Sequence, residues 1–294
     1  MNINDIQKVV VLGAGSMGHQ IAMLSALGGF ETTLQDINED ALLNAKNLLN
    51  KRMDNWVSKG KITEERKQAA FSKLQTTTEL EIAVKDADLV IEAVVEKLDV
   101  KREVFSQVDK FAPKHTIFAT NSSTIVNSKI ADVTSRPEKF LNMHFFFPPL
   151  VMDCVEVVKS DKTSDETAKV AMDFCEKIGR TGVLLEKEIY GFIANRSLFA
   201  LSNEAMYLYE NGYADFKDID VIAKKALNHP LGPFELADLS GIDVGYYANL
   251  QLYEETGNPK DKPAKSVEEK VKAGHLGRKV GKGWYDYQTE SVKK

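Results

Sequence analysis

A histidine and a glutamate in two neighbouring apolar segments are the side chains whose types and spacing best indicate chemistry. His144 closes the apolar run 140–143, and Glu156 lies inside the run 154–158, which is otherwise almost wholly apolar. A buried carboxylate is costly unless it is paired, and a histidine is its natural partner. Such a pair can take the proton of an alcohol, because imidazole titrates in the physiological range. The alternatives are a core histidine with a satisfied hydrogen bond and an edge-strand glutamate that faces water.

A glycine-rich run near the N-terminus has the spacing of a dinucleotide-binding turn. The run reads Gly13-Ala14-Gly15-Ser16-Met17-Gly18, and it lies between the apolar run 9–12 and a helical pattern, as the motif requires. We expect Gly13 to form a tight turn, Gly15 to let the backbone approach a pyrophosphate, and Gly18 to let helix and strand pack closely. The N–H groups at the start of the helix would then bind the phosphates.

An acidic residue follows the next apolar run at the distance expected for ribose binding. Asp36 ends the run 32–35, where a carboxylate would accept hydrogen bonds from the adenine ribose and repel a 2′-phosphate. This position favours NAD over NADP. The alternative for the whole motif is a glycine turn that binds nothing.

Two further polar segments are candidates for holding substrate. Asn121-Ser122-Ser123-Thr124 follows the run 116–119, where hydroxyl and amide groups can orient a nicotinamide and a substrate, or can simply cap a helix. Asn195 lies near the start of a later helical stretch, and a lone asparagine on a helix is usually solvated or capping.

The alternation of strand and helix patterns predicts the elements that must position these residues. Short β-branched or apolar runs predict strands at 9–12, 32–35, 89–91, 116–119, 140–143, 155–158 and 183–185. Helical stretches at 16–27, 39–56 and from Thr63 onward lie between them. This pattern is typical of an α/β Rossmann-type fold, with a doubly wound, mostly parallel sheet.

After Glu188 the strand signal fades. Helices are predicted at 192–210, 216–227, 234–254 and 266–273. We therefore expect a Rossmann domain at 1–187 and an all-α domain at 188–294, with the boundary near Lys187.

Composition limits the class of protein. The chain has 294 residues and a net charge of -5, so a general affinity for nucleic acid is not expected. Its two cysteines, Cys154 and Cys175, have no metal-ligand spacing, so we predict no metal site and no disulfide framework. No apolar run reaches the ~20 residues of a membrane span. The start of the chain lacks an apolar signal core, so we expect a cytoplasmic protein.

Several of these motifs together resemble the 3-hydroxyacyl-CoA dehydrogenase family, particularly its short bacterial 3-hydroxybutyryl-CoA dehydrogenases. The resemblance covers essentially the whole chain. It is carried by GAGSMG at 13–18, EAVVE at 92–96, NSS at 121–123, HFF at 144–146, VEV at 155–157, GFIANR at 191–196, GPFEL at 232–236 and GRKVGKGWY at 277–285.

The resemblance implies a role for each matching residue. His144 would be the general base and Glu156 would orient it, while Ser123 and Asn195 would contact substrate at the reacting centre. On the cofactor side it implies Asp36, Glu96, Lys101, Ser123 and Lys279. It also implies a homodimer built on the helical domain. Coenzyme A would bind partly along the helical excursion after the second strand, where Arg52, Lys59 and Lys61 supply positive charge; a solvated charged face is the alternative.

One residue departs from the family pattern. The family usually reads HFFNP, with an asparagine that contacts the nicotinamide, whereas Phe147 occupies that position here. A phenyl ring cannot supply the hydrogen bonds of an amide.

The expected activity is therefore NAD-dependent oxidation of a short-chain 3-hydroxyacyl-CoA to the 3-ketoacyl-CoA, or the reverse. Phe147 leaves two alternatives. One is a dehydrogenase of a small hydroxy acid without coenzyme A, such as a sugar acid or a carnitine-like molecule. The other is an NAD-binding protein that has lost its chemistry.

Overall fold

The computed structural model describes residues 1–287 and divides into two compact units. The first unit is Met1–Phe192 and the second begins at Ile193. The sequence pattern had placed the domain boundary near Lys187.

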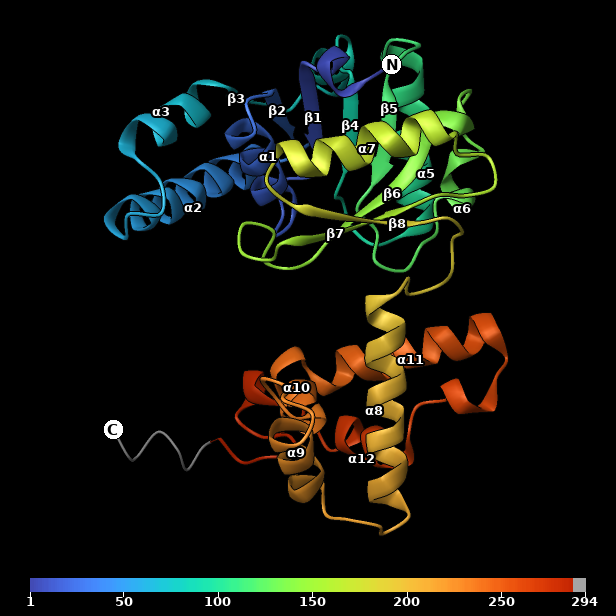
Figure 1. Cartoon of the computed structure of the whole chain (residues 1–294). Coiled ribbons are helices and arrows are strands. Elements are labelled where there is room, and N and C mark those ends of the chain that lie inside the picture. Colours follow the sequence, from blue (N-terminus) through green and yellow to red (C-terminus); the bar gives the residue numbers. More distant parts are fainter. Residues whose placement is uncertain (288–294) are drawn as a thin grey trace. The chain divides into compact units, whose positions relative to one another are not determined.

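The first unit is built on one twisted sheet (Figure 1). Its strands are β1 (Lys8–Leu12), β2 (Glu31–Gln35), β3 (Leu74–Thr77), β4 (Leu89–Glu92), β5 (Ile117–Thr120), β6 (Phe140–Phe145), β7 (Cys154–Val158) and β8 (Thr181–Leu185). They lie in the order β3-β2-β1-β4-β5-β6-β7-β8. Neighbours are parallel except β6 and β7, which are antiparallel. The predicted Rossmann-type, mostly parallel sheet is confirmed.

Two details of the sheet differ from the sequence expectation. Strand β3 was not predicted, because its sequence Leu-Gln-Thr-Thr lies half exposed at the sheet edge and lacks an apolar run. Strand β6 continues through His144 to Phe145, so the histidine lies within the strand and not after it.

Helices cover both faces of the sheet. The helical segments of this unit are η1 (Ile3–Asp5), α1 (Gly18–Leu27), α2 (Glu39–Ser58), α3 (Glu64–Ser72), α4 (Leu80–Val84), α5 (Leu98–Phe111), α6 (Ser128–Ala131), η2 (Pro137–Lys139) and α7 (Asp165–Lys177). Thr63 caps α3 by accepting a hydrogen bond from the backbone N–H of Arg66.

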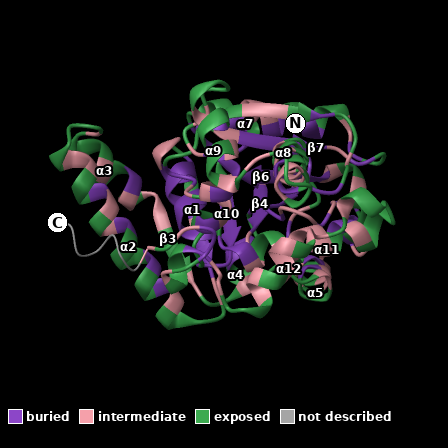
Figure 2. Ribbon diagram, turned by 90° about the horizontal axis from the view of Figure 1, so that it is seen from below, coloured by how far each residue is buried: buried purple, intermediate pink, exposed green. Residues whose placement is uncertain are grey.

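Alternate strand residues pack into different cores, which explains why the strands read as continuous apolar runs. Val9 and Val11 of β1 pack with α1, α2 and α7, whereas Val10 and Leu12 pack with α4, α5 and α6. The buried residues in Figure 2 lie along the sheet and on the helix faces that cover it. This two-faced burial fixes the strand ends that carry the glycine turn and His144.

The second unit is all helical in its described part, as predicted. Its helical segments are α8 (Ala194–Glu210), α9 (Phe216–Lys225), α10 (Pro233–Ser240), α11 (Ile242–Thr256), η3 (Pro259–Asp261), α12 (Lys265–Lys272) and η4 (Arg278–Val280). The single helix predicted over 234–254 is wrong. Gly241 has φ of +99°, outside the right-handed helical region, and it separates α10 from α11.

Two buried carboxylates hold this unit together. Asp220 accepts the backbone N–H groups of Phe234 and Glu235 at the start of α10, together with the hydroxyl of Tyr285. Asp238 accepts the N–H groups of Trp284 and Tyr285. Burial raises the pKa of Asp220. The GPFEL and GRKVGKGWY segments therefore supply the hydrogen-bond donors through which these carboxylates connect the helices.

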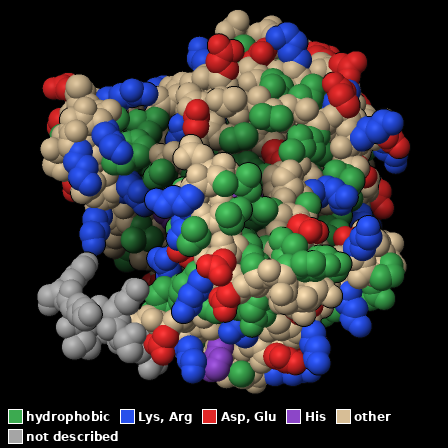
Figure 3. Space-filling model, turned by 60° about the horizontal axis from the view of Figure 1, so that its bottom comes forward, with side chains coloured by type: hydrophobic (Ala, Val, Ile, Leu, Met, Phe, Trp, Pro, Cys, Tyr) green, Lys and Arg blue, Asp and Glu red, His purple; other side chains and the backbone are tan. Residues whose placement is uncertain are grey.

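The surface carries mixed charge. On the face drawn in Figure 3, Lys and Arg side chains are interspersed with Asp and Glu and with hydrophobic side chains. Within the described residues, no helix is both long and apolar enough to cross a membrane.

Candidate active site

The glycine turn follows β1 at the carboxyl edge of the sheet. Gly13 has φ of +98°, and a Cβ there would lie 2.6 Å from the Ala93 carbonyl oxygen. A Cβ on Gly18 would lie 1.8 Å from the Gly13 carbonyl oxygen, whereas one on Gly15 would meet nothing within 4 Å. The first and third glycines are thus required by packing, and the second leaves open space for a ligand. Ser16 is exposed, and Met17 packs on the core.

Asp36 lies directly beside this turn. Its Oδ2 accepts the backbone N–H of Ala14 at 2.7 Å, and its Oδ1 accepts that of Asn38 at 2.9 Å. A carboxylate oxygen has further lone pairs, so the group can still accept ribose hydroxyls. Gly13, Gly15, Asp36 and the segment 93–95 line a cavity of about 450 Å³. An acidic group, an open glycine backbone and apolar walls fit the adenosine half of NAD.

A buried network supports the next strand ends. The Lys101 ammonium, 1% exposed, lies 2.7 Å from Glu92 and 3.1 Å from Glu96. Glu92 also accepts the Thr120 hydroxyl at 2.7 Å. The Glu92 carboxylate, at the end of β4, is fully buried, and its bonds connect β4 to β5 and to α5.

Glu96 joins that network to the serine segment. Its Oε1 accepts the Ser122 hydroxyl and, at 3.1 Å, the backbone N–H of Ser123. Partial desolvation acts to raise the pKa of Glu96. The Lys101 ammonium and the Ser122 hydroxyl outweigh it and hold this pKa below its usual range. The structure therefore brings Glu96, Lys101 and Ser123 together at one strand edge, with the Ser122 hydroxyl committed to Glu96.

His144 and Glu156 face each other across β6 and β7. They are register partners in the antiparallel pair, so their side chains lie on the same face of the sheet. The His144 Nδ1 lies 2.7 Å from Glu156 Oε2, and both side chains are buried. The carboxylate orients the ring and favours the tautomer with hydrogen on Nδ1, which leaves Nε2 as the proton acceptor.

Aromatic side chains and an amide surround the imidazole. The His144 ring lies 4.6 Å from that of Phe146 and 5.5 Å from that of Phe192, measured between centroids. Asn121 Oδ1 accepts the backbone N–H of Phe145, the residue after the histidine, at 3.0 Å. Because β5 and β6 are parallel neighbours, this bond connects the serine segment to the histidine strand.

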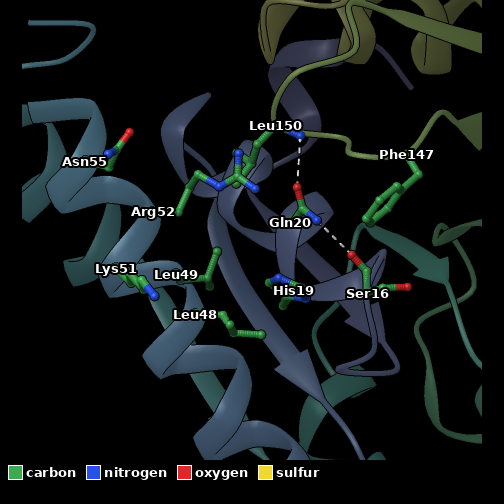
Figure 4. A pocket seen from close by; sticks show the side chains of 10 residues that line it. All are labelled: Ser16, His19, Gln20, Leu48, Leu49, Lys51, Arg52, Asn55, Phe147 and Leu150. Atoms are coloured by element: carbon green, nitrogen blue, oxygen red, sulfur yellow. Dashed lines mark hydrogen bonds between the residues drawn. The ribbon is translucent and has the colours of Figure 1, made fainter. Parts of the chain in front are cut away.

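A second cavity, of about 560 Å³, opens between α1, α2 and the segment 147–150 (Figure 4). It is lined by Ser16, His19, Gln20, Leu48, Leu49, Lys51, Arg52, Asn55, Phe147 and Leu150. The Arg52 side chain extends from α2 into this space. Phe147 is 64% exposed and lies at its edge near Ser16.

The remaining predicted site residues lie elsewhere. Lys59 is exposed at the end of α2 and does not line this cavity. Asn195 is in α8 and Lys279 is in η4, both in the second unit. The Lys279 ammonium pairs with Asp243 at 2.6 Å.

Three residues that the sequence analysis did not select lie at the candidate site. Glu92 carries a recognisable signal, since it is a carboxylate at the end of an apolar strand. Gln20 donates to the Ser16 carbonyl at 2.9 Å, and its Oε1 accepts the Leu150 N–H at 3.4 Å, so it joins the glycine turn to the segment after His144. His19, in the first turn of α1, had no signal beyond its position beside the motif.

Comparisons with known proteins identify the family of the chain. The model of the 3-hydroxyacyl-CoA dehydrogenase NAD-binding domain matches residues 8–189, and that of the family's C-terminal domain matches 191–287. A probable 3-hydroxybutyryl-CoA dehydrogenase of Bacillus subtilis is 38% identical over 98% of this chain and 99% of its own.

Solved structures show the same architecture. The (S)-3-hydroxybutyryl-CoA dehydrogenase of Ralstonia eutropha matches with a TM-score of 0.92 and 36% identity, over 96% of this chain and 99% of its own. A diketoreductase that acts on dicarbonyl compounds matches with a TM-score of 0.84 and 36% identity, over the same shares. With its glycine turn, Asp36 and the paired His144 and Glu156, the chain belongs to the 3-hydroxyacyl-CoA dehydrogenase family of NAD-dependent oxidoreductases.

Proposed function

We propose that this protein interconverts short-chain 3-hydroxyacyl-CoA and 3-ketoacyl-CoA thioesters, with His144 as the general base and acid. The observation that carries the proposal is the buried His144–Glu156 pair at 2.7 Å, placed at the same carboxyl edge of the sheet as the glycine turn. A proton acceptor at the same sheet edge as a dinucleotide turn is an arrangement suited to oxidation of a secondary alcohol.

The chain's own residues account for the proton and for its charge. When bound, NAD supplies the hydride acceptor at C4 of its nicotinamide. His144 Nε2 takes the proton of the substrate hydroxyl in oxidation and returns it in reduction. The Glu156 carboxylate stabilises the imidazolium that forms, because it lies against Nδ1 in a buried site. Ser123 and Asn195 are proposed to hold the substrate oxygen.

The second cavity is proposed to take the coenzyme A part of the substrate. It lies beside the segment that follows His144, and Arg52 and Lys51 give it positive charge for phosphate groups. Leu48, Leu49 and Leu150 form apolar walls that suit the aliphatic part of the coenzyme A arm, called the carrier arm below. Lys59, the residue just after α2, is proposed to meet the outer phosphates.

A second candidate function is reduction or oxidation of a small carbonyl compound without coenzyme A. Two observations favour it. Phe147 presents an apolar ring at the edge of the cavity, and the diketoreductase of similar structure acts on dicarbonyl compounds.

A single assay series tests both candidates. NADH oxidation is followed by absorbance with acetoacetyl-CoA and with free acetoacetate, for the wild type and for His144→Ala. We expect acetoacetyl-CoA to be the better substrate and His144→Ala to lower kcat by about 10² to 10⁴. His115→Ala is the matched control, since His115 pairs with Asp88 at the exposed end of the sheet. Near-normal turnover by His144→Ala would end the assignment, and a preference for free acetoacetate would favour the second candidate.

The assembly and the location of the protein are proposals of the same kind. A homodimer through the second unit is supported by exposed apolar side chains there, among them Tyr213, Ile222, Val244 and Tyr247. A cytoplasmic location is supported by Cys154 and Cys175, both free thiols.

A further inference from the structure

His19 is a buried titratable residue that the mechanism above does not use. Only 7% of it is exposed, yet it lines the second cavity, between the glycine turn and the leucines of α2 (Figure 4). Its Nδ1 lies 2.5 Å from the Gly15 carbonyl oxygen. A carbonyl can only accept, so Nδ1 carries the hydrogen and the neutral ring keeps an acceptor lone pair on Nε2.

The second ring nitrogen has no hydrogen-bond partner within residues 1–287. This Nε2 atom is not fully enclosed by protein. Because the side chain lines the cavity, a ligand there can reach it. The other polar group of the same turn is different: both ends of the Gln20 amide are bonded, to Ser16 and Leu150. An unpartnered acceptor on an otherwise buried side chain is the kind of group that a ligand satisfies.

We propose that His19 is a specificity residue for the substrate's carrier arm, whose amide N–H or hydroxyl donates a hydrogen bond to His19 Nε2. The proposal rests on the acyl-CoA function proposed above. The arm of coenzyme A suits this position because it carries amide and hydroxyl donors and leads to phosphate groups, for which Arg52 and Lys51 line the same cavity. The adenosine cavity, by contrast, lies on the Asp36 side of the turn and contains neither His19 nor Arg52.

The surroundings keep the imidazole in its accepting form. Burial, followed by the positive charge of Arg52, lowers the pKa of His19, although its bond to the Gly15 carbonyl acts in the opposite direction. Among the residues that line the cavity, Lys51 and Arg52 of α2 are the charged groups; those from the glycine turn, α1 and the segment 147–150 are uncharged. No carboxylate in this lining would favour the protonated ring.

Two amide substitutions separate the two ring nitrogens. His19→Asn keeps a donor near the Nδ1 position for Gly15 and removes the acceptor at Nε2. His19→Gln places an amide oxygen near the Nε2 position and removes the bond to Gly15. With NADH and acetoacetyl-CoA, we expect His19→Asn to raise KM for acetoacetyl-CoA about 3- to 10-fold, the effect of one neutral hydrogen bond. Its kcat, its KM for NADH and its KM for free acetoacetate should stay within about twofold of the wild type.

His19→Gln should keep KM for acetoacetyl-CoA within about twofold of the wild type. The pH profile gives a readout that a purely structural role would not move. As pH falls through the lowered pKa of His19, the ring loses its acceptor, so the wild-type KM for acetoacetyl-CoA should rise at acidic pH. Neither amide titrates, so this rise should be absent in both variants.

An unchanged KM for acetoacetyl-CoA in His19→Asn would overturn the proposal. So would a rise in KM for NADH alone, because that would assign His19 to the cofactor turn. If the wild type itself fails to turn over acetoacetyl-CoA, the proposed function fails, and this inference fails with it before any variant is compared.

Discussion

Replacement of Glu156 by glutamine tests the charge of the His144 pair without changing its shape. The two side chains are buried and 2.7 Å apart, and the imidazolium that forms during alcohol oxidation is adjacent to the carboxylate. For charge centres about 4 Å apart and an effective dielectric constant of about 20, their attraction is about 4 kcal/mol. Glu156→Gln removes this attraction and leaves a buried amide of similar volume.

The loss of kcat follows from how much of that charge is present in the transition state. If half of it has developed, the barrier rises by about 2 kcal/mol, and if all of it has developed, by about 4 kcal/mol. These values correspond to a fall in kcat of about 30- to 1000-fold. The glutamine amide can also donate a hydrogen bond to Nδ1, which would favour the tautomer with its hydrogen on Nε2, where the base must accept.

The assay is steady-state reduction of NAD with 3-hydroxybutyryl-CoA, the oxidation direction in which this charge develops, together with a thermal unfolding curve for each variant. Glu186→Gln is the matched control, because Glu186 lies just after the neighbouring strand β8 and pairs with Lys159 at the surface. We expect the control to retain wild-type kcat. If Glu156→Gln folds normally and its kcat lies within about threefold of the wild type, the charge of Glu156 does not contribute to catalysis and the reasoning is wrong.

The glycine turn and Asp36 give two further tests. Gly13→Ala forces a side chain at φ of +98° and 2.6 Å from the Ala93 carbonyl, so it should lower the free energy of unfolding by about 2 to 5 kcal/mol in denaturant melts. Gly15→Ala meets nothing within 4 Å, so its stability should match the wild type while its dissociation constant for NADH rises; equal stability of the two variants would contradict this account. Asp36→Asn removes the charge that repels a 2′-phosphate, so the ratio of kcat/KM for NADH to that for NADPH should fall about 10- to 100-fold, and an unchanged ratio would remove Asp36 from cofactor selection.

The regular part of the fold could be predicted because each pattern has a local cause. Strand β1 reads as a continuous apolar run because both of its faces are buried, and the glycine turn follows because only glycine tolerates the conformation at residue 13. Strand β3 could not be predicted in this way, because an exposed edge strand of mixed polar residues carries no pattern. The break at Gly241 was also missed, because the apolar spacing continues through it.

Sequence alone determined the residue types of the site: a dinucleotide turn followed by an acid, and a histidine and a glutamate in apolar strands. These are properties of short segments, and short segments are what a sequence shows directly. Tertiary structure decided which of these residues meet. The antiparallel register of β6 and β7 places His144 opposite Glu156, and the ends of β4 and β5 place Glu92 and Glu96 around Lys101 and Ser122.

The proposed role of His19 rests on features that only the packed structure provides. From the sequence, His19 is a helix residue that follows a glycine motif, and nothing distinguishes it from a core side chain. The direction of its two nitrogens depends on the Gly15 carbonyl on one side and on the cavity beside α2 on the other. The bond to Gly15 is local, but the cavity is formed with α2 and the segment 147–150, which are distant in the chain, so no local pattern shows that Nε2 faces a binding space.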